Sequence, residues 1–222
     1  DYKGFKNSQR AVVYYNRGNV YDAQRDFDKA IRDYEEAVKL NPKYSDAFGN
    51  MANTYRRSGN LRMALSNYDQ AIVLNRKNFR NYFGRGLAYF FSGNFEKASA
   101  DIRTVRRMIP KSPSARFENI WLFMSEARLG HEAKARENLK KFRESFHWGA
   151  ADYWDYQVVR MFLGEHTPEE CLELRESTGP LGKTTTRKLF YVGQYYLLND
   201  ETEKALEYFH RCLDECSPGT FE

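Results

Sequence analysis

The pattern of apolar and polar residues repeats along the first half of the chain. Three segments that begin at Ala11, Ser45 and Phe79 align at a step of 34 residues, because 45 − 11 and 79 − 45 both equal 34. Within each segment, aromatic and small residues recur three or four positions apart, which is the spacing of one face of an α-helix. Gly59-Asn60 and Gly93-Asn94 interrupt this spacing midway, as a turn between two helices does. The pattern therefore predicts helical hairpins.

Residues of one kind occupy matching positions in each segment: an aromatic at position 4, a small residue at 8, Tyr at 11, Ala at 20, an aromatic at 24, a small residue at 27 and Pro at 32. The first segment supplies Tyr14, Gly18, Tyr21, Ala30, Tyr34, Ala37 and Pro42. The second has Arg76 in place of Pro and supplies Phe48, Ala52, Tyr55, Ala64, Tyr68 and Ala71. The third has Ile102 and Val105 at positions 24 and 27 and supplies Tyr82, Gly86, Tyr89, Ala98 and Pro110. A later match consists of Leu189, Gly193, Tyr196, Ala205, Phe209, Cys212 and Pro218.

This pattern resembles the tetratricopeptide repeat (TPR). The resemblance implies an all-α fold, a right-handed α-solenoid of helix-turn-helix repeats with a degenerate helical C-terminal extension. A glycine inside a helix costs about 1 kcal/mol relative to alanine. The glycines at position 8 therefore need a compensating gain, which is the close approach of two helices. The repeat-packing residues predicted on this basis are Gly18, Ala30, Ala52, Ala64, Gly86, Ala98, Gly193 and Ala205.

The repeats divide the chain into three parts. Residues 1–112 hold three regular repeats (11–44, 45–78 and 79–112), residues 113–182 an irregular helical hairpin and short helices, and residues 183–222 a final TPR-like hairpin. Within the middle part we expect a hairpin over 113–143, a helix over 148–164, a short helix from Thr167-Pro168 to about residue 176, and a loop over 177–182.

A narrower resemblance covers the C-terminal two-thirds of the chain. The string NIWLFMSEA at residues 119–127 is similar to a helix of the NlpI-like bacterial TPR lipoproteins, as is the order of elements that follows it. This resemblance implies an envelope adaptor that docks proteases or cell-wall hydrolases and can dimerise. The chain opens with Asp1 rather than Met, so we interpret it as a fragment. We expect a periplasmic or membrane-anchored protein if this resemblance holds, and otherwise a cytoplasmic one.

The concave groove of a TPR array is lined by positions 2, 5, 6, 9, 12 and 13 of the first helix of each repeat. Asparagines at such positions can pair with the backbone of an extended peptide, or they are simply solvated helix residues. Phe83, Leu87 and Phe90 form an apolar anchor pocket or are covered by later helices. The candidate groove residues are Tyr15, Asn16, Asn19, Asp22, Asn50, Asn53, Arg56, Arg80, Phe83, Leu87 and Phe90.

One known TPR site can be tested on the sequence directly. Clamp-type TPR domains hold the terminal carboxylate of heat-shock chaperones with Asn and Lys or Arg side chains. This chain keeps Asn19, Asn50 and Arg80 at the matching positions, but Tyr15 and Gly84 stand where the clamp has cations. A carboxylate site that lacks two cations binds weakly, so we reject the chaperone-clamp hypothesis.

Composition narrows the remaining function classes. Aromatic residues make up 16% of the 222 residues, which argues against disorder, and the net charge of 35 − 30 = +5 is spread along the chain. Basic residues on two helices allow an RNA or acidic-partner binder as a lesser alternative, although we interpret them as solvated: Arg103, Arg106, Arg107, Lys111, Lys140, Lys141 and Arg143. No run of about 18 apolar residues occurs, so we expect no membrane span in this fragment.

The sequence gives little support for catalysis. His131-Glu132 lacks the second His of a zinc-protease helix, and no phosphate-binding or dinucleotide-binding glycine motif occurs. Cys171 lies five residues after His166, a spacing that is common by chance, and Cys212 and Cys216 are interpreted as small buried side chains. We therefore expect no enzyme activity, catalytic residue, metal or cofactor. The predicted function is a protein-interaction scaffold, with a homo-oligomeric self-assembly protein built on Trp121 and Trp154 as the alternative.

Overall fold

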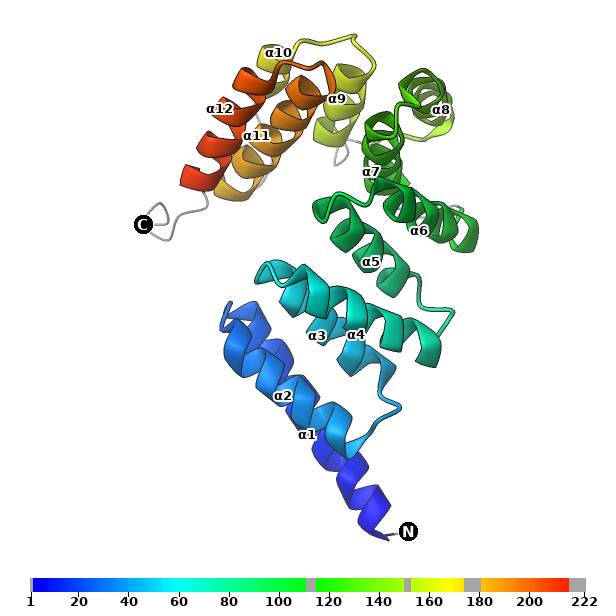
Figure 1. Cartoon of the computed structure of the whole chain (residues 1–222), viewed down its shortest axis with the longest axis vertical. Coiled ribbons are helices and arrows are strands. Elements are labelled where there is room, and N and C mark those ends of the chain that lie inside the picture. The colour runs from blue at the N-terminus through cyan, green and yellow to red at the C-terminus, as the bar shows by residue number, and fades with distance from the viewer. Residues whose placement is uncertain (1, 111–114, 150–152, 174–180, 216–222) are drawn as a thin grey trace. The chain divides into compact units, whose positions relative to one another are not determined.

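The computed structural model describes residues 2–110, 115–149, 153–173 and 181–215, and within these ranges the protein is built of α-helices without strands (Figure 1). This confirms the predicted all-α fold. In chain order the helices are α1 (Tyr2–Ala23), α2 (Phe27–Leu40), α3 (Ser45–Arg57), α4 (Leu61–Leu74), α5 (Phe79–Phe91), α6 (Phe95–Met108), α7 (Ala115–Arg128), α8 (Glu132–Ser145), α9 (Tyr153–Phe162), α10 (Pro168–Glu173), α11 (Leu181–Leu198) and α12 (Thr202–Glu215).

The chain forms two compact units, Asp1–Trp121 and Leu122–Glu222. In the first unit α1–α2, α3–α4 and α5–α6 are antiparallel hairpins, and α2 packs on α3 as α4 packs on α5 (Figure 1). A single hairpin cannot bury its own apolar face, so each hairpin buries it against its neighbours in the stack. The unit includes the first half of α7, because Trp121 packs against Phe90 with their ring centroids 5.0 Å apart.

The turns inside the hairpins follow from local backbone chemistry. Gly59 and Gly93 end their helices with φ of +84° and +78°, the left-handed conformation that glycine adopts without strain. Asn60 and Asn94 then begin the next helices, each with its side-chain oxygen accepting a hydrogen bond from the backbone N–H three residues later. In the first hairpin Arg25 adopts φ of 61°, and Asp26 is the cap.

The eight residues predicted to pack the repeats are all buried. Gly18 shows the reason, since a Cβ there would lie 2.8 Å from Cε1 of Tyr34 on the facing helix. At Gly193 a Cβ would lie 2.5 Å from Cε1 of Phe209. Small residues at position 8 therefore make room for the aromatic ring at position 24 of the same hairpin.

Gly84 also makes room for an aromatic ring, in this case one from the neighbouring hairpin. It is buried, and a Cβ on it would lie 2.5 Å from Cζ of Tyr68, which belongs to the preceding hairpin. The sequence places Gly84 where a chaperone clamp has a cation. In the structure the Tyr68 ring occupies that place, so a long side chain at residue 84 would displace the tyrosine.

The second unit contains a further helical hairpin, α11–α12, with α9 and α10 packed against α11 and with α8 packed against α9. The rings of Tyr196 and Tyr208 stack across the hairpin at 5.4 Å with an interplanar angle of 11°. Thr167 caps α10 as predicted, because its hydroxyl accepts a hydrogen bond from the N–H of Glu170, whose carboxylate accepts one from the N–H of Thr167.

Two predicted boundaries in this unit are wrong. The helix expected over 148–164 begins only at Tyr153, with residues 150–152 outside the described ranges. Trp148 lies before this helix, and its indole N–H donates a hydrogen bond of 2.9 Å to the carbonyl of Arg143. The loop expected over 177–182 ends earlier, because α11 begins at Leu181, and residues 177–180 are outside the described ranges.

A Gly84→Ala substitution should lower the thermal unfolding midpoint, because the added methyl group overlaps the Tyr68 ring. Overpacking of this kind costs about 1–3 kcal/mol. The control is Gly86→Ala on the same helix, where the nearest atom is a flexible Ile102 carbon at 3.2 Å, so a smaller loss is expected. Circular dichroism at 222 nm measures both. An unchanged or higher midpoint for Gly84→Ala would contradict this account of the packing.

Candidate functional site

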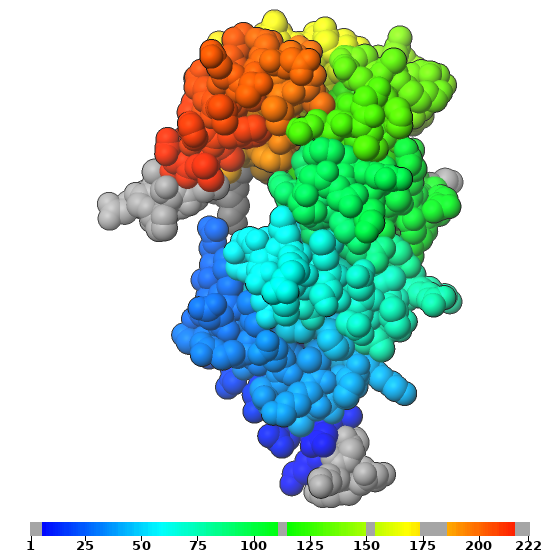
Figure 2. All heavy atoms as spheres, viewed as in Figure 1, coloured from blue at the N-terminus to red at the C-terminus, as the bar shows by residue number. Residues whose placement is uncertain are grey.

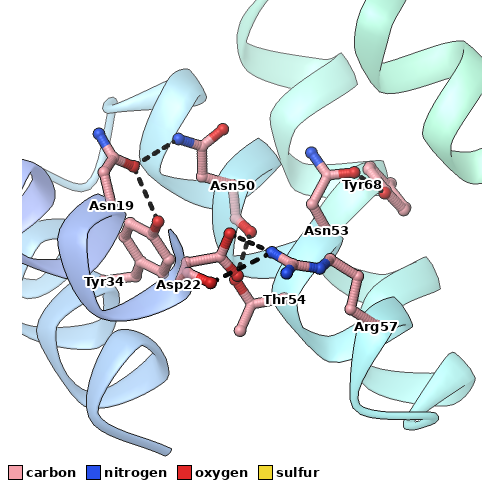
Figure 3. A network of polar contacts seen from close by, with 8 residues as sticks. All are labelled: Asn19, Asp22, Tyr34, Asn50, Asn53, Thr54, Arg57 and Tyr68. Carbon is pink, nitrogen blue, oxygen red and sulfur yellow. Dashed lines mark hydrogen bonds and ion pairs between the residues drawn. The ribbon is translucent and has the colours of Figure 1, made fainter. Parts of the chain in front are cut away.

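A polar pocket of about 320 Å³ opens in the first unit where α1 and α3 lie side by side (Figure 3). Five of the eleven predicted groove residues line it together. Two further residues, Tyr34 and Arg57, complete the wall. The full lining is Asn19, Asp22, Tyr34, Asn50, Asn53, Arg56 and Arg57.

The pocket contains asparagines whose oxygens are already engaged. Asn19 Oδ1 accepts hydrogen bonds from the Tyr34 hydroxyl at 2.8 Å and from Asn50 Nδ2 at 2.7 Å. Asn53 Oδ1 accepts one from the Tyr68 hydroxyl at 2.6 Å. Figure 3 shows the amide nitrogens of Asn19 and Asn53 directed away from these bonds. Asn19 and Asn53 thus each keep two N–H donors for another acceptor, whereas Asn50 donates to Asn19 and Tyr15.

The tyrosines that hold these asparagines are core residues. Tyr34 and Tyr68 are 1% and 0% exposed, yet their hydroxyls reach the asparagines on the groove side. Burial raises the pKa of both hydroxyls above the ordinary tyrosine value, so both remain protonated donors at neutral pH. The repeat pattern predicts a packing role for these two tyrosines but gives no indication of this second role.

A carboxylate and two guanidinium groups set the charge of the pocket. Asp22 accepts a hydrogen bond of 2.8 Å from the Thr54 hydroxyl and forms an ion pair with Arg57. Nε of Arg56 is buried and has no hydrogen-bond partner among the described residues. One negative and two positive side chains leave the lining with a net charge of +1. The pocket therefore favours ligands that supply hydrogen-bond acceptors.

Three other predicted groove residues, on α1 and at the start of α5, do not line this pocket. The Tyr15 hydroxyl accepts a hydrogen bond of 3.1 Å from Asn50, and its ring packs on Tyr44 at 4.9 Å. Asn16 and Arg80 are exposed, with the Arg80 guanidinium 5.2 Å from the centroid of the Phe79 ring.

For Phe90 the sequence left two alternatives open, an apolar anchor pocket or coverage by later helices. This residue is only 5% exposed and packs edge-on against Phe95 at 5.3 Å and Trp121 at 5.0 Å. Phe83 and Leu87 remain half-buried on the same helix. Of the two alternatives raised by the sequence, coverage by a later helix applies to Phe90, because α7 begins where a fourth regular repeat would.

The remaining candidate chemistry does not form a site. Burial raises the pKa of the Cys171 thiol to about 11, so the thiolate that a nucleophile needs is scarce at neutral pH. Across the described ranges no three His, Cys, Asp or Glu side chains gather closely enough to hold a metal ion. Among the helices described, none combines the length and apolar character that crossing a bilayer requires.

Three models of the tetratricopeptide repeat match the chain, at residues 11–44, 33–66 and 50–113. Residues 11–113 therefore contain tetratricopeptide repeats, as the period of 34 residues predicts.

Solved TPR structures share the fold. A tetratricopeptide repeat protein from Parabacteroides merdae is 18% identical over 94% of this chain and 80% of its own, with a TM-score of 0.62. The TPR domain of Arabidopsis OM64 is 25% identical over 52% of this chain and 96% of its own, with a TM-score of 0.50. The TPR2B domain of yeast Sti1, solved as a complex with pHsp70, is 19% identical over 54% and 98%, with a TM-score of 0.52.

Substituting Tyr34 and Tyr68 by Phe should reduce the alkaline instability of the protein. Since the folded state keeps both hydroxyl protons above pH 10, unfolding releases them, and stability falls as the pH rises beyond the unfolded pKa of about 10. Thermal midpoints from pH 8 to 11 measure the effect. The double variant should start lower at pH 8, by about 1 kcal/mol for each lost hydrogen bond, and fall less steeply. Parallel curves would show that these hydroxyls do not titrate differently on folding.

Proposed function

We propose that the groove of the first unit binds an extended segment of a partner protein, and that the protein is a non-catalytic interaction scaffold. One observation carries this proposal. Asn19 and Asn53 occupy the same position in consecutive repeats, and each is fixed by a buried tyrosine so that its amide N–H groups are presented to the groove.

Amide donors at repeated positions suit a peptide backbone. An extended chain presents carbonyl oxygens at regular intervals, and amide side chains can bind these whatever the peptide's own side chains are. Because the tyrosines hold the asparagines in one orientation before binding, less side-chain freedom is lost when the peptide arrives. The Arg56 guanidinium lines the same pocket and adds positive charge beside this row. An acidic or carbonyl-rich segment is therefore favoured.

The fold is compatible with this use, since the yeast Sti1 domain of the same fold was solved in complex with pHsp70. The ligand proposed for this chain differs from a chaperone terminus. Tyr15 hydrogen-bonds to Asn50, and Gly84 lies against the Tyr68 ring, so neither place presents the cation of a carboxylate clamp. Half-buried Phe83 and Leu87 supply apolar contact further along α5.

Changing Asn19 and Asn53 to Asp tests the proposal with little disturbance of the fold. Aspartate keeps the oxygen that accepts the tyrosine hydrogen bond but replaces the outward N–H donors with an acceptor. Capture of partner proteins from native lysate, measured by quantitative mass spectrometry, should fall at least tenfold, because two hydrogen bonds of about 1 kcal/mol each are lost.

Gln9→Glu with Gln70→Glu is the matched control, because it adds the same charge at exposed positions outside the predicted groove. Circular dichroism should show equal helicity in all three proteins. Equal capture by the wild type and the Asn19→Asp/Asn53→Asp variant would refute the groove proposal.

The finer form of the proposal is an envelope adaptor similar to the NlpI-like lipoproteins, located in the periplasm or anchored to a membrane. It rests on the resemblance of residues 119–127 and of the elements that follow. Fractionation of cells that make the full-length protein tests the location. Recovery in the cytosolic fraction would contradict the envelope assignment while leaving the groove proposal intact.

Self-assembly through the tryptophans is not favoured by their surroundings. Trp121 packs on Phe90 and Phe91 within the first unit, and Trp154 packs on Tyr191 at 5.7 Å with Arg187 over its ring within the second. Homodimerisation stays a prediction, which sedimentation over a range of concentrations can test.

A further inference from the structure

The first hairpin exposes residues that the other two hairpins bury. Val13 and Val20, two turns apart on α1, are 65% and 55% exposed. One repeat later the same positions hold Ala47 and Thr54, both 0% exposed, and two repeats later they hold Asn81 and Ala88, at 3% and 0%. In each of those hairpins a preceding helix covers the face. The first hairpin lies at one end of the first unit, drawn in blue in Figure 2.

Between α1 and α2 this end face contains a pocket of about 400 Å³. Arg17 stands at its centre and forms two hydrogen bonds of 2.7 Å with the carboxylate of Asp33. Its guanidinium lies over the rings of Tyr14 at 5.5 Å and Tyr21 at 5.9 Å. The complete lining is Tyr14, Arg17, Tyr21, Lys29, Arg32, Asp33 and Glu36.

The third hairpin contains a second copy of this arrangement, 68 residues later. Arg85 forms two hydrogen bonds of 2.8 Å with Asp101 and lies over Tyr82 at 5.7 Å and Tyr89 at 5.9 Å. In this copy the remaining nitrogen, Nη1, donates a hydrogen bond of 2.6 Å to Asp69 on α4 of the preceding hairpin.

The two copies differ in what covers them. The Arg85 side chain is 20% exposed under α4, whereas that of Arg17 is 56% exposed. Among the described residues no second carboxylate bonds to Arg17, so its Nη1 has no counterpart of Asp69. In the internal copy, the arginine is thus covered by a helix that brings a carboxylate.

The helices that cover the internal faces share a sequence signature. On α4, Leu65, Asp69 and Ile72 are spaced i, i+4 and i+7, and Leu65 packs in the cluster around Ala88. On α2 the same positions hold Ile31, Glu35 and Val38. Val38 packs beneath the second hairpin, and Glu35 accepts a hydrogen bond of 3.4 Å from Tyr55 there. An aliphatic residue, an acid and a second aliphatic residue on one helix face therefore mark the covering helix.

We propose that the exposed α1 face docks an amphipathic helix of a partner protein that carries this signature. Its two aliphatic residues cover Val13 and Val20, and its carboxylate bonds to Nη1 of Arg17. The basic side chains in the pocket lining outnumber the acidic ones by three to two, which complements an acidic helix. This face does not share a lining residue with the groove, so the inference stands apart from the groove proposal.

A second copy of this chain fits the face less well. The last helix, α12, holds Leu206, His210 and Leu213 at the signature positions, so a histidine stands where the acid is needed. On α6 the positions hold Ser99, Arg103 and Arg106, which lack both the acid and the aliphatic pair. Among the described helices, α2 and α4 match, and both already cover internal faces.

A helical peptide with the sequence of residues 61–74 provides the probe, because it carries the signature that the structure itself uses. A hydrocarbon staple in place of Ser66 and Gln70, both exposed, keeps it helical without altering the signature face. Fluorescence anisotropy with the full 222-residue protein should show saturable binding. A peptide with Asp69→Asn should bind at least fivefold more weakly.

Val13→Asp with Val20→Asp in the protein should weaken binding of the unaltered peptide at least tenfold. Both positions are exposed, so the variant should keep its helicity by circular dichroism. The Asn19→Asp/Asn53→Asp variant is the control, and it should bind the peptide as the wild type does. Failure of the groove proposal would leave these results unchanged.

Two results would overturn the proposal. One is equal peptide affinity for the wild type and the Val13→Asp/Val20→Asp variant, which would place binding elsewhere, for example where the peptide displaces α4. The other is a sedimentation coefficient of the protein alone that rises with concentration in the wild type but not in this variant. That result would assign the face to a second copy of the chain.

Discussion

The site in the first unit depends on a tyrosine whose ring packs against a glycine and whose hydroxyl hydrogen-bonds to an asparagine. Tyr34 starts on α2, lies against Gly18 on α1 and ends with its hydroxyl on Asn19. The same ring packs the hairpin and orients the groove. A larger residue at position 18 would move the ring, and the asparagine would lose the bond that directs its amide. The packing of the hairpin and the orientation of the asparagine N–H donors therefore depend on the same tyrosine.

Much of the fold can be predicted from the sequence because close packing of helices requires small residues at regularly spaced positions. Glycine and alanine at fixed intervals of 34 residues mark where helices touch. The six packing residues predicted in this way are buried, as are Gly193 and Ala205 of the later match. The turns can also be predicted from the sequence, since Gly59 and Gly93 adopt the left-handed conformation and the following asparagines cap the next helix. The surroundings of Phe90 and Trp148 could not be predicted in this way, because Trp121 and the carbonyl of Arg143 belong to elements outside the regular period.

The groove itself was predictable in position but not in geometry. The sequence brings Asn19, Asn50 and Asn53 to one face, yet it does not state which atom of each amide is engaged. A signal was present nonetheless. Tyrosine follows asparagine by 15 residues in both of the first two repeats, since 34 − 19 and 68 − 53 are equal, while the third repeat replaces both with Leu87 and Ile102. Joint loss of the pair within one chain indicates that the two side chains act together.

The groove and the end face use the same physical device. In the groove, the hydroxyl of a buried tyrosine engages the asparagine oxygen, and the amide nitrogen is directed away from this bond. At the end face, the buried carboxylate of Asp33 engages two guanidinium nitrogens of Arg17 and leaves the third. A side chain that is already held pays little further entropy when a partner binds. In the third hairpin the equivalent arginine, Arg85, makes the additional hydrogen bond to Asp69. The Arg85 arrangement is therefore the model for how we propose that a partner carboxylate binds Arg17.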